Sequence, residues 1–285
     1  PGAAPARFAV AGVTFLLGSA CALGAVAVAV FSHRFAWWRK TVPWAHPRIL
    51  MYHMVREPLA GATFNKLRVA PAAFEAQLRW LRDEGWYFAT MAELGAGESL
   101  PPRTVVLTFD DGYADNLLAA DPILERYDAR ATLYLVEDRF DRDWSTSKKA
   151  HHDSGELRDE VKLTDEQIEA MLASGRWELG GHTRTHVNLA TVTPEERESE
   201  IAGARKSLAQ RFGVAVDSFA YPFGIYGPAD VVAVAEAGFR TAVTTQEGIS
   251  LDVAEEALEL RRIKVSGKDS LFAFRLRLRT GFRGA

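Results

Sequence analysis

The sequence predicts an α/β domain with parallel strands, and three observations support this fold class. Short apolar runs alternate with amphipathic helical segments from Arg48 to Val265, which is the pattern of consecutive βα units. The run TVVLTF at 104–109 is nearly continuously apolar, as strands buried on both faces are. The chain of 285 residues is also long enough to bury the core of one large α/β domain or two small ones.

The first half of the expected domain alternates strands with helices. A strand at 48–55 comes first, and a helix at 71–84 follows, because apolar side chains recur on one helical face before a glycine. The buried strand at 104–109 leads through a helix at 116–127 into another apolar strand at 131–136.

The second half resumes the alternation after a polar segment, 137–162, which we interpret as a long surface loop. Capping residues open helices at 164–175 and 193–213. The C-terminal segment 269–282 is expected to be a helix, with a strand carrying alternating arginines as the alternative. The remaining elements are strands at 177–180, 218–221, 240–245 and 260–265, and a helix at 228–237.

The N-terminal segment differs from the rest of the chain because positions 8–31 hold no charged residue. As a helix rising about 1.5 Å per residue, this segment is long enough for a hydrocarbon core of about 30 Å, so we expect one membrane span. A cleaved signal peptide and a lipoprotein site at Cys21 are the alternatives. The expected organisation is an anchor and linker at 1–47 and one domain at 48–285.

The charges that flank the expected span leave its orientation open. Arg34, Arg39 and Lys40 follow it while Arg7 alone precedes it, so a literal count would place the domain in the cytoplasm. Because the sequence starts at Pro1 rather than Met, we do not base the orientation on that count. We expect a single-pass, membrane-anchored protein with its domain outside the cytoplasm.

Composition narrows the classes of partner. The formal net charge is -3 and no basic stripe is interleaved with aromatic residues, so we expect no nucleic-acid partner. A neutral or mixed-charge substrate fits this composition better. The single cysteine, Cys21, cannot form an internal disulfide, so stability has to come from packing.

Two adjacent acids, Asp110 and Asp111, follow the strand at 104–109, and Gly112 allows a tight turn there. In parallel α/β folds, ligands bind beyond the carboxyl ends of the strands, which is where these acids are expected. Taken alone, the pair does not distinguish a ligand site from an ordinary turn, in which Asp110 caps the turn and Asp111 is solvated.

A second cluster changes that balance. The segment WELGGHTRTH places His182 and His186 four positions apart after another strand, on one side of an expected helical turn. Two imidazoles and one carboxylate, with open positions for water, are the ligands of a catalytic zinc-type site. The second aspartate would remain free to accept a proton from the activated water. His151 and His152 are instead expected to be solvated in the loop.

These motifs resemble those of a known enzyme family. TFDDGY, GHTRTH and AYPFG resemble the leading motifs of the NodB-homology polysaccharide deacetylases, carbohydrate esterase family 4. The resemblance covers about 48–265 and implies a distorted (β/α) barrel and metal-dependent removal of acetyl groups from N-acetylated sugars. LMYHMV and LRRIKV look like the branch that acts on poly-N-acetylglucosamine and related bacterial surface glycans.

Residue by residue, the resemblance implies Asp110 as the catalytic base. It implies Asp111, His182 and His186 as ligands of a divalent metal, Zn²⁺ first, with Co²⁺ or Ni²⁺ as alternatives.

The motif AYPFG matches the loop whose backbone N–H holds the oxyanion, which implicates Tyr221, Pro222, Phe223 and Gly224. The family's usual tyrosine is Phe223 in this chain. Because the contribution is a backbone N–H, the loss of a hydroxyl should matter little.

The chain departs from the family pattern at two places. Many relatives carry an arginine that orients the base where this chain has Ala220, and a histidine acting as general acid is missing from LRRIKV. Arg262 is a candidate to replace the arginine, with a surface salt bridge as the alternative. His53 is a candidate for the acid or for a sugar contact, with a core-packed histidine as the alternative.

We therefore expect a metal-dependent hydrolase that removes N-acetyl groups from a glycan containing N-acetylglucosamine. A glycan-binding protein with a degraded site is one alternative, because of the two departures. A deacetylase of a lipid-linked sugar is the other, because of the expected membrane span.

Overall fold

The computed structural model describes residues 6–35, 37–97, 99–144 and 155–282, and within the first helix it describes side chains from Cys21 onward. His151 and His152 lie outside the described residues, so the prediction that they are solvated stays a prediction.

Within the described residues, seven parallel strands close into a barrel because β5 pairs back with β1. The order around the barrel is β1-β10-β9-β8-β7-β6-β5. A short strand, β4 (Tyr87–Ala89), pairs with the beginning of β5. The barrel strands are β1 (Arg48–Tyr52), β5 (Thr104–Asp110), β6 (Ala131–Leu135), β7 (Trp177–Gly181), β8 (Ser218–Ala220), β9 (Thr241–Glu247) and β10 (Leu260–Lys264).

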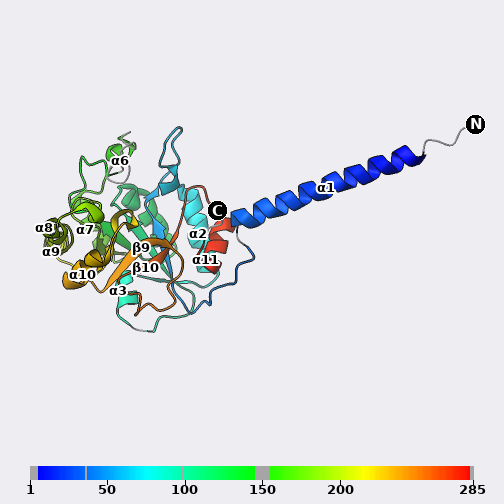
Figure 1. Ribbon diagram of the computed structural model, residues 1–285. Coiled ribbons are helices and arrows are strands. Elements are labelled where there is room, and N and C mark those ends of the chain that lie inside the picture. The colour runs from blue at the N-terminus through cyan, green and yellow to red at the C-terminus, as the bar shows by residue number, and fades with distance from the viewer. Residues whose placement is uncertain (1–5, 36, 98, 145–154, 283–285) are drawn as a thin grey trace, which may run out of the picture.

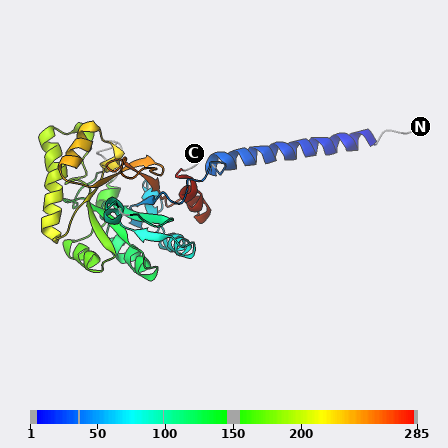
Figure 2. The same cartoon turned by 90° about the horizontal axis from the view of Figure 1, so that it is seen from below.

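Helices surround the strands on the outside of the barrel, as Figures 1 and 2 show. Each connection between consecutive barrel strands joins two neighbouring parallel strands, and an apolar layer fills the space between strands and helices. This arrangement confirms the predicted (β/α) barrel. The helices on the domain are α2 (Pro71–Asp83), α3 (Met91–Gly95), α4 (Asp121–Arg126), α6 (Glu156–Asp159), α7 (Asp165–Ala173), α8 (Pro194–Glu198), α9 (Ala204–Phe212), α10 (Pro228–Glu236) and α11 (Leu271–Thr280).

The predicted first strand is shorter than expected. It ends at Tyr52, and β2 (Met54–Val55) leaves the barrel to pair with β3 (Arg68–Val69). At this break, side chains replace the lost strand partners of the backbone. Asn116 donates to the carbonyl of His53 at 2.9 Å, and Val55 N–H donates to Asp115 at 2.9 Å. The break leaves His53 at the mouth of the barrel.

One other segment also differs from the sequence prediction. The segment expected to be one long loop contains the helical turn α6, which Arg68 holds through an ion pair with Glu156 at 2.6 Å. The predicted C-terminal helix is confirmed as α11, and the alternative of a strand is wrong. Ser270 caps its first turn and Gly281 ends it in the left-handed conformation.

Alternation along β5 decides which side chains enter the barrel. Val105, Leu107 and Phe109 pack in the layer under the helices, whereas Val106 belongs to a separate interior cluster. Because successive strand residues face opposite sides, Asp110 points into the barrel with Val106. A carboxylate is thereby placed at the top of a closed interior.

The first helix, α1 (Ala6–Phe35), projects away from the barrel, as Figure 1 shows. It contacts the domain at its base, where the ring centroids of Phe35 and Phe272 of α11 lie 5.4 Å apart. Among the residues that were described, none of the helices combines the length and apolar character needed to cross a membrane. The predicted span at 8–31 therefore finds no support there.

Candidate active site

The two aspartates stand at the carboxyl end of β5, where the chain turns sharply. Asp111 has a φ of 79° and Gly112 a φ of 80°. A Cβ at position 112 would lie 2.6 Å from Cδ1 of Leu135, so only glycine fits this turn. The turn separates the two carboxylates, with Asp110 directed into the barrel and Asp111 toward the end of β7.

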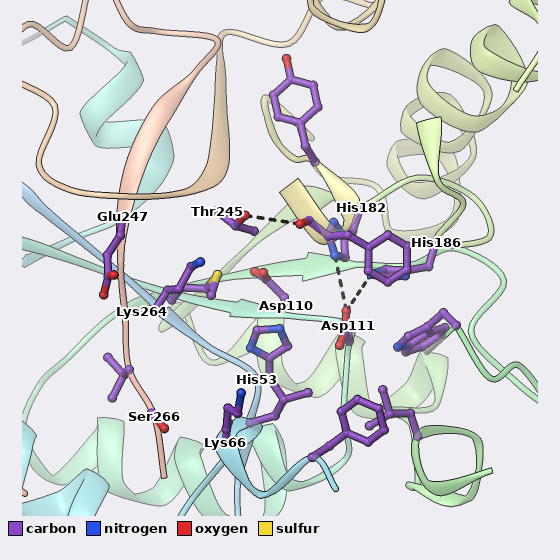
Figure 3. Close-up of a pocket in the computed structure, with 18 of the residues that line it drawn as sticks. His53, Lys66, Asp110, Asp111, His182, His186, Thr245, Glu247, Lys264 and Ser266 are labelled. Carbon is purple, nitrogen blue, oxygen red and sulfur yellow. Dashed lines mark hydrogen bonds and ion pairs between the residues drawn. The ribbon is translucent and has the colours of Figure 1, made fainter. Parts of the chain in front are cut away.

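Asp111, His182 and His186 converge as the sequence predicts. Oδ1 of Asp111 lies 3.4 Å from Nε2 of His182 and 3.3 Å from Nε2 of His186, as the dashed lines in Figure 3 show. The three side chains are 3%, 2% and 4% exposed, and their ligand atoms all lie within 4.8 Å of one another. The histidines do not share a helical turn, however, because Thr183 and His186 adopt positive φ angles of 63° and 57°.

The donor set fits a divalent metal ion. Oδ1 of Asp111 is buried and receives no hydrogen bond from the described residues, a costly state that a cation would relieve. Burial lowers the pKa of His186, which favours the neutral imidazole that binds metals. Burial raises the pKa of Asp111, but the two imidazoles outweigh it and hold that pKa well below its ordinary value. One carboxylate and two imidazoles match a zinc-type site.

Asp110 is paired with the arginine that the sequence singled out. Arg262 donates from both terminal nitrogens to the two Asp110 oxygens, at 2.7 and 2.8 Å. It also donates to Thr108 Oγ1 at 3.1 Å and to the carbonyl of Thr244 at 2.9 Å. Burial raises the pKa of Asp110, but attraction by Arg262 and His53 outweighs it, so the carboxyl stays ionised. Arg262 is completely buried, which rules out the surface salt bridge.

The loop after β8 borders the histidines. Gly224 has a φ of 66°, and a Cβ there would lie 1.9 Å from Thr245 Oγ1, so this position requires glycine. Thr245 in turn donates to the carbonyl of Phe223 at 3.3 Å, and Tyr221 donates to the carbonyl of Leu258 at 3.0 Å. Pro222 begins a single helical turn. The loop has a fixed shape, and the oxyanion role of its backbone N–H stays a prediction.

Comparisons with known proteins agree with this geometry. The polysaccharide deacetylase family profile matches residues 97–242, about half of the chain. YxkH of Bacillus subtilis, a candidate polysaccharide deacetylase, is 32% identical over 242 residues, which are 83% of this chain and 77% of YxkH. The chain belongs to the polysaccharide deacetylase family.

More distant members of this family extend the likeness. The poly-β-1,6-N-acetyl-D-glucosamine N-deacetylase of Staphylococcus aureus is 23% identical over 224 residues, which are 70% of this chain and 71% of the relative. The Streptococcus pyogenes deacetylase PplD, solved in complex with acetate, superposes on this chain with a TM-score of 0.67 at 27% identity. The superposition covers 82% of this chain and 98% of the PplD chain. A Bacillus cereus polysaccharide deacetylase gives a TM-score of 0.69 at 26% identity, with coverage of 82% and 69%.

In this family member, the cluster of Asp111, His182 and His186 and the carboxylate of Asp110 lie in one pocket of about 680 Å³. His53 lines the same pocket and lies beside Asp110 and Asp111 (Figure 3). Its position at the site, rather than in the core, agrees with a catalytic or substrate-contacting role. The predicted residues that line the pocket are His53, Asp110, Asp111, His182, His186, Tyr221 and Phe223.

Sequence reasoning missed several residues of the deacetylase pocket. Glu247 and Lys264 end β9 and β10, so the rule that placed Asp110 at a strand end could have found them. Lys66 and Trp144 come from connecting segments, where no pattern marks them. Figure 3 shows that Glu247 and Lys264 form the wall away from the histidines. The pocket therefore has one wall that carries Asp111 and the two histidines, and one polar wall that carries Glu247 and Lys264.

Proposed function

We propose that this protein hydrolyses N-acetyl groups on a glycan that contains N-acetylglucosamine, with a divalent metal, Zn²⁺ first, in its site. The observation that carries the proposal is one open pocket lined by two groups of side chains. Asp111, His182 and His186 form the first, and Asp110, which Arg262 holds from behind the pocket wall, is the second. A pocket of about 680 Å³ suits a sugar chain better than a small amide alone.

Each side chain of the site has a distinct role in this reaction. Asp110 accepts the proton of the attacking water. Arg262 keeps the Asp110 carboxylate ionised and fixes both carboxylate oxygens. His53, beside the two aspartates, donates a proton to the leaving amine, and the backbone near Phe223 receives the oxyanion. A zinc ion held by Asp111 and the two histidines would supply Lewis acidity, which activates water and polarises the acetyl carbonyl.

The likeness to the Staphylococcus aureus relative supports a particular polymer. That relative is named for activity on poly-β-1,6-N-acetyl-D-glucosamine. We take this polymer as the first substrate to test. The alternative of a non-catalytic glycan-binding protein depends on two missing side chains, but Arg262 pairs with Asp110 and His53 lines the pocket, so both candidates to replace them are near Asp110. This arrangement favours the enzyme.

Acetate release tests the proposal directly. The substrates are β-1,6- and β-1,4-linked N-acetylglucosamine oligomers and a lipid-linked N-acetyl sugar, each with chelator and after addition of Zn²⁺, Co²⁺ or Ni²⁺. We expect release from the β-1,6-linked oligomer, loss on chelation, and loss in Asp110→Asn. The matched control is Asp217→Asn, whose carboxylate pairs with Arg205 outside the pocket.

Two results would reject the proposal. Acetate release that survives both chelation and Asp110→Asn contradicts the metal-dependent mechanism. Binding of oligosaccharide without acetate release under every metal supports the glycan-binding alternative. Preference for the lipid-linked sugar would move the substrate assignment but keep the chemistry.

We also propose that α1 holds the enzyme at a membrane, with the domain outside the cytoplasm. The absence of charge over 8–31 and the exposure of Trp37 and Trp38, 47% and 63%, next to that helix support the attachment to a membrane. Membrane fractionation tests the anchor, and protease treatment of intact cells tests the side. Recovery of the full chain in the soluble fraction contradicts it.

A further inference from the structure

The two histidines of the cluster are oriented in different ways. Nδ1 of His182 lies 2.7 Å from the carbonyl of Ala220, a hydrogen bond that directs Nε2 toward Asp111. Nδ1 of His186 is buried and has no hydrogen-bond partner in the part of the chain that the structure describes. Metal-binding histidines usually have their second nitrogen held by such a bond. Another contact therefore has to fix the His186 ring.

Two aromatic rings enclose the imidazole of His186. Its centroid lies 4.4 Å from that of Phe223 at an interplanar angle of 83°, and 5.0 Å from that of Trp144 at 36°. Trp144 is only 3% exposed, so its indole is a fixed surface rather than a mobile flap. Ring packing thus replaces the missing hydrogen bond at His186.

A buried lysine lies behind this indole. The Lys162 ammonium lies 4.9 Å from the Trp144 centroid and 4.7 Å from that of Tyr113, and the residue is 6% exposed. Nζ donates to the carbonyls of Leu157 and Glu160, both at 2.6 Å, which leaves one of its three N–H groups for the rings. A desolvated cation over an aromatic face is attracted strongly, which fixes the indole in place.

Backbone pairing ties Lys162 to the metal-binding turn. Ala114 N–H donates to the carbonyl of Val161, and Leu163 N–H donates to the carbonyl of Gly112, both at 2.9 Å. Lys162 therefore sits in a two-stranded bridge with the residues that directly follow Asp111. A shift of the lysine would move both the Trp144 ring and the turn that carries the carboxylate ligand.

We propose that Trp144 and Lys162 are positioning residues that orient His186 as a metal ligand. The proposal rests on the proposed metal-dependent function and adds that one ligand is held by a lysine-supported aromatic stack. Lys162 is inferred to act through Trp144, and Trp144 through His186. Their effect is expected in metal binding first and in acetate release only as a consequence.

Metal affinity and ligand geometry test the proposal in the full chain. Lys162→Met removes the ammonium, Trp144→Leu removes the ring, and Lys162→Arg and Trp144→Phe restore the charge and a ring. For each, the Zn²⁺ dissociation constant is measured by chelator competition, and the visible spectrum of the Co²⁺ form reports ligand geometry. We expect Lys162→Met and Trp144→Leu to weaken Zn²⁺ binding about 10- to 100-fold and to alter the Co²⁺ spectrum. The restoring variants should fall closer to wild type.

A matched pair elsewhere controls for loss of a cation over a tryptophan. Arg275 lies 5.1 Å from the Trp80 centroid on the α2 and α11 side of the domain. Arg275→Met and Trp80→Leu should leave Zn²⁺ affinity and the Co²⁺ spectrum unchanged. Far-UV circular dichroism identifies the variants that fold, and if Lys162→Met does not fold, the Trp144 pair decides.

The outcomes separate this inference from the proposed function. Folded Lys162→Met and Trp144→Leu variants with wild-type Zn²⁺ affinity and Co²⁺ spectrum would overturn the inference and leave the metal-dependent function standing. A wild-type protein that binds neither Zn²⁺ nor Co²⁺ would overturn both this inference and the proposed metal-dependent function. Weakened affinity with an unchanged Co²⁺ spectrum would also count against it, because the ring orientation of His186 is what the stack is inferred to set.

Discussion

The pair formed by Arg262 and Asp110 should behave as one energetic unit. Two charge-assisted hydrogen bonds of 2.7 and 2.8 Å join side chains that are completely or almost completely buried. Arg262→Met leaves a buried carboxylate without its partner, and Asp110→Asn leaves a buried guanidinium without a charge to match. Either single change should lower the free energy of unfolding at pH 7 by about 3–5 kcal/mol.

The double variant should lose much less than the sum of the two singles, because it removes both charges together. Two unit charges about 4 Å apart at an effective dielectric constant of about 20 interact by roughly 4 kcal/mol, so we expect a coupling energy of about 3–4 kcal/mol. The coupling energy is measured by urea unfolding at pH 7 of the wild type, the two single variants and the double variant. Acetate release should fall by at least about 100-fold in each single variant, since the base is either lost or displaced.

Arg176 and Asp121 supply the matched control. They also form two charge-assisted hydrogen bonds, from Nε and one terminal nitrogen of Arg176, at 3.0 and 2.8 Å. Their side chains are 22% and 13% exposed and lie outside the pocket. We expect a coupling of about 1 kcal/mol there and unchanged acetate release. A coupling at Arg262 and Asp110 no larger than this control would refute the reasoning.

Three further predictions concern pH, metal and substrate. Burial raises the pKa of Asp115 from 3.8 to about 6, so the ionised carboxyl costs stability above that pH and the cost disappears as the pH falls toward 4. Because this side chain is partly exposed, Asp115→Asn should stabilise the protein by about 1–2 kcal/mol at pH 7 and flatten the pH dependence of urea unfolding between about 4 and 6. Zn²⁺ at about 100 times its dissociation constant should raise the unfolding free energy by about 2.7 kcal/mol, and His182→Ala should abolish that gain in thermal unfolding. On the polar pocket wall, Glu247 has a buried oxygen that receives no hydrogen bond from any residue the structure describes. Glu247→Ala should therefore raise KM for oligomers with little change in kcat, and Glu247→Gln should do so less. Equal KM values would contradict the last prediction.

Local chain patterns anticipated most of the barrel but not its irregular parts. Strands such as 104–109 were predictable because a buried strand is apolar on both faces. The break after Tyr52 was not, since it depends on Asn116 and Asp115, which meet β2 only in the folded chain. The same holds for α6, which an arginine from β3 secures.

The convergence of Asp111, His182 and His186 follows from the sequence by itself, because parallel strands bring their carboxyl ends to one edge and each ligand follows a strand. Their path was misjudged as a helical turn, since positive φ angles in the loop are set by its surroundings rather than by spacing.

Tertiary structure alone decided which side chains support those ligands. Arg262 reaches Asp110 across 152 positions of sequence, and only the closure of β1 between β5 and β10 brings their strands into one interior. Trp144 and Lys162 carry no motif and become part of the site only because their segment folds back against the turn after Asp111. Strand ends follow from periodicity along the chain, whereas packing between distant segments depends on how the whole barrel closes.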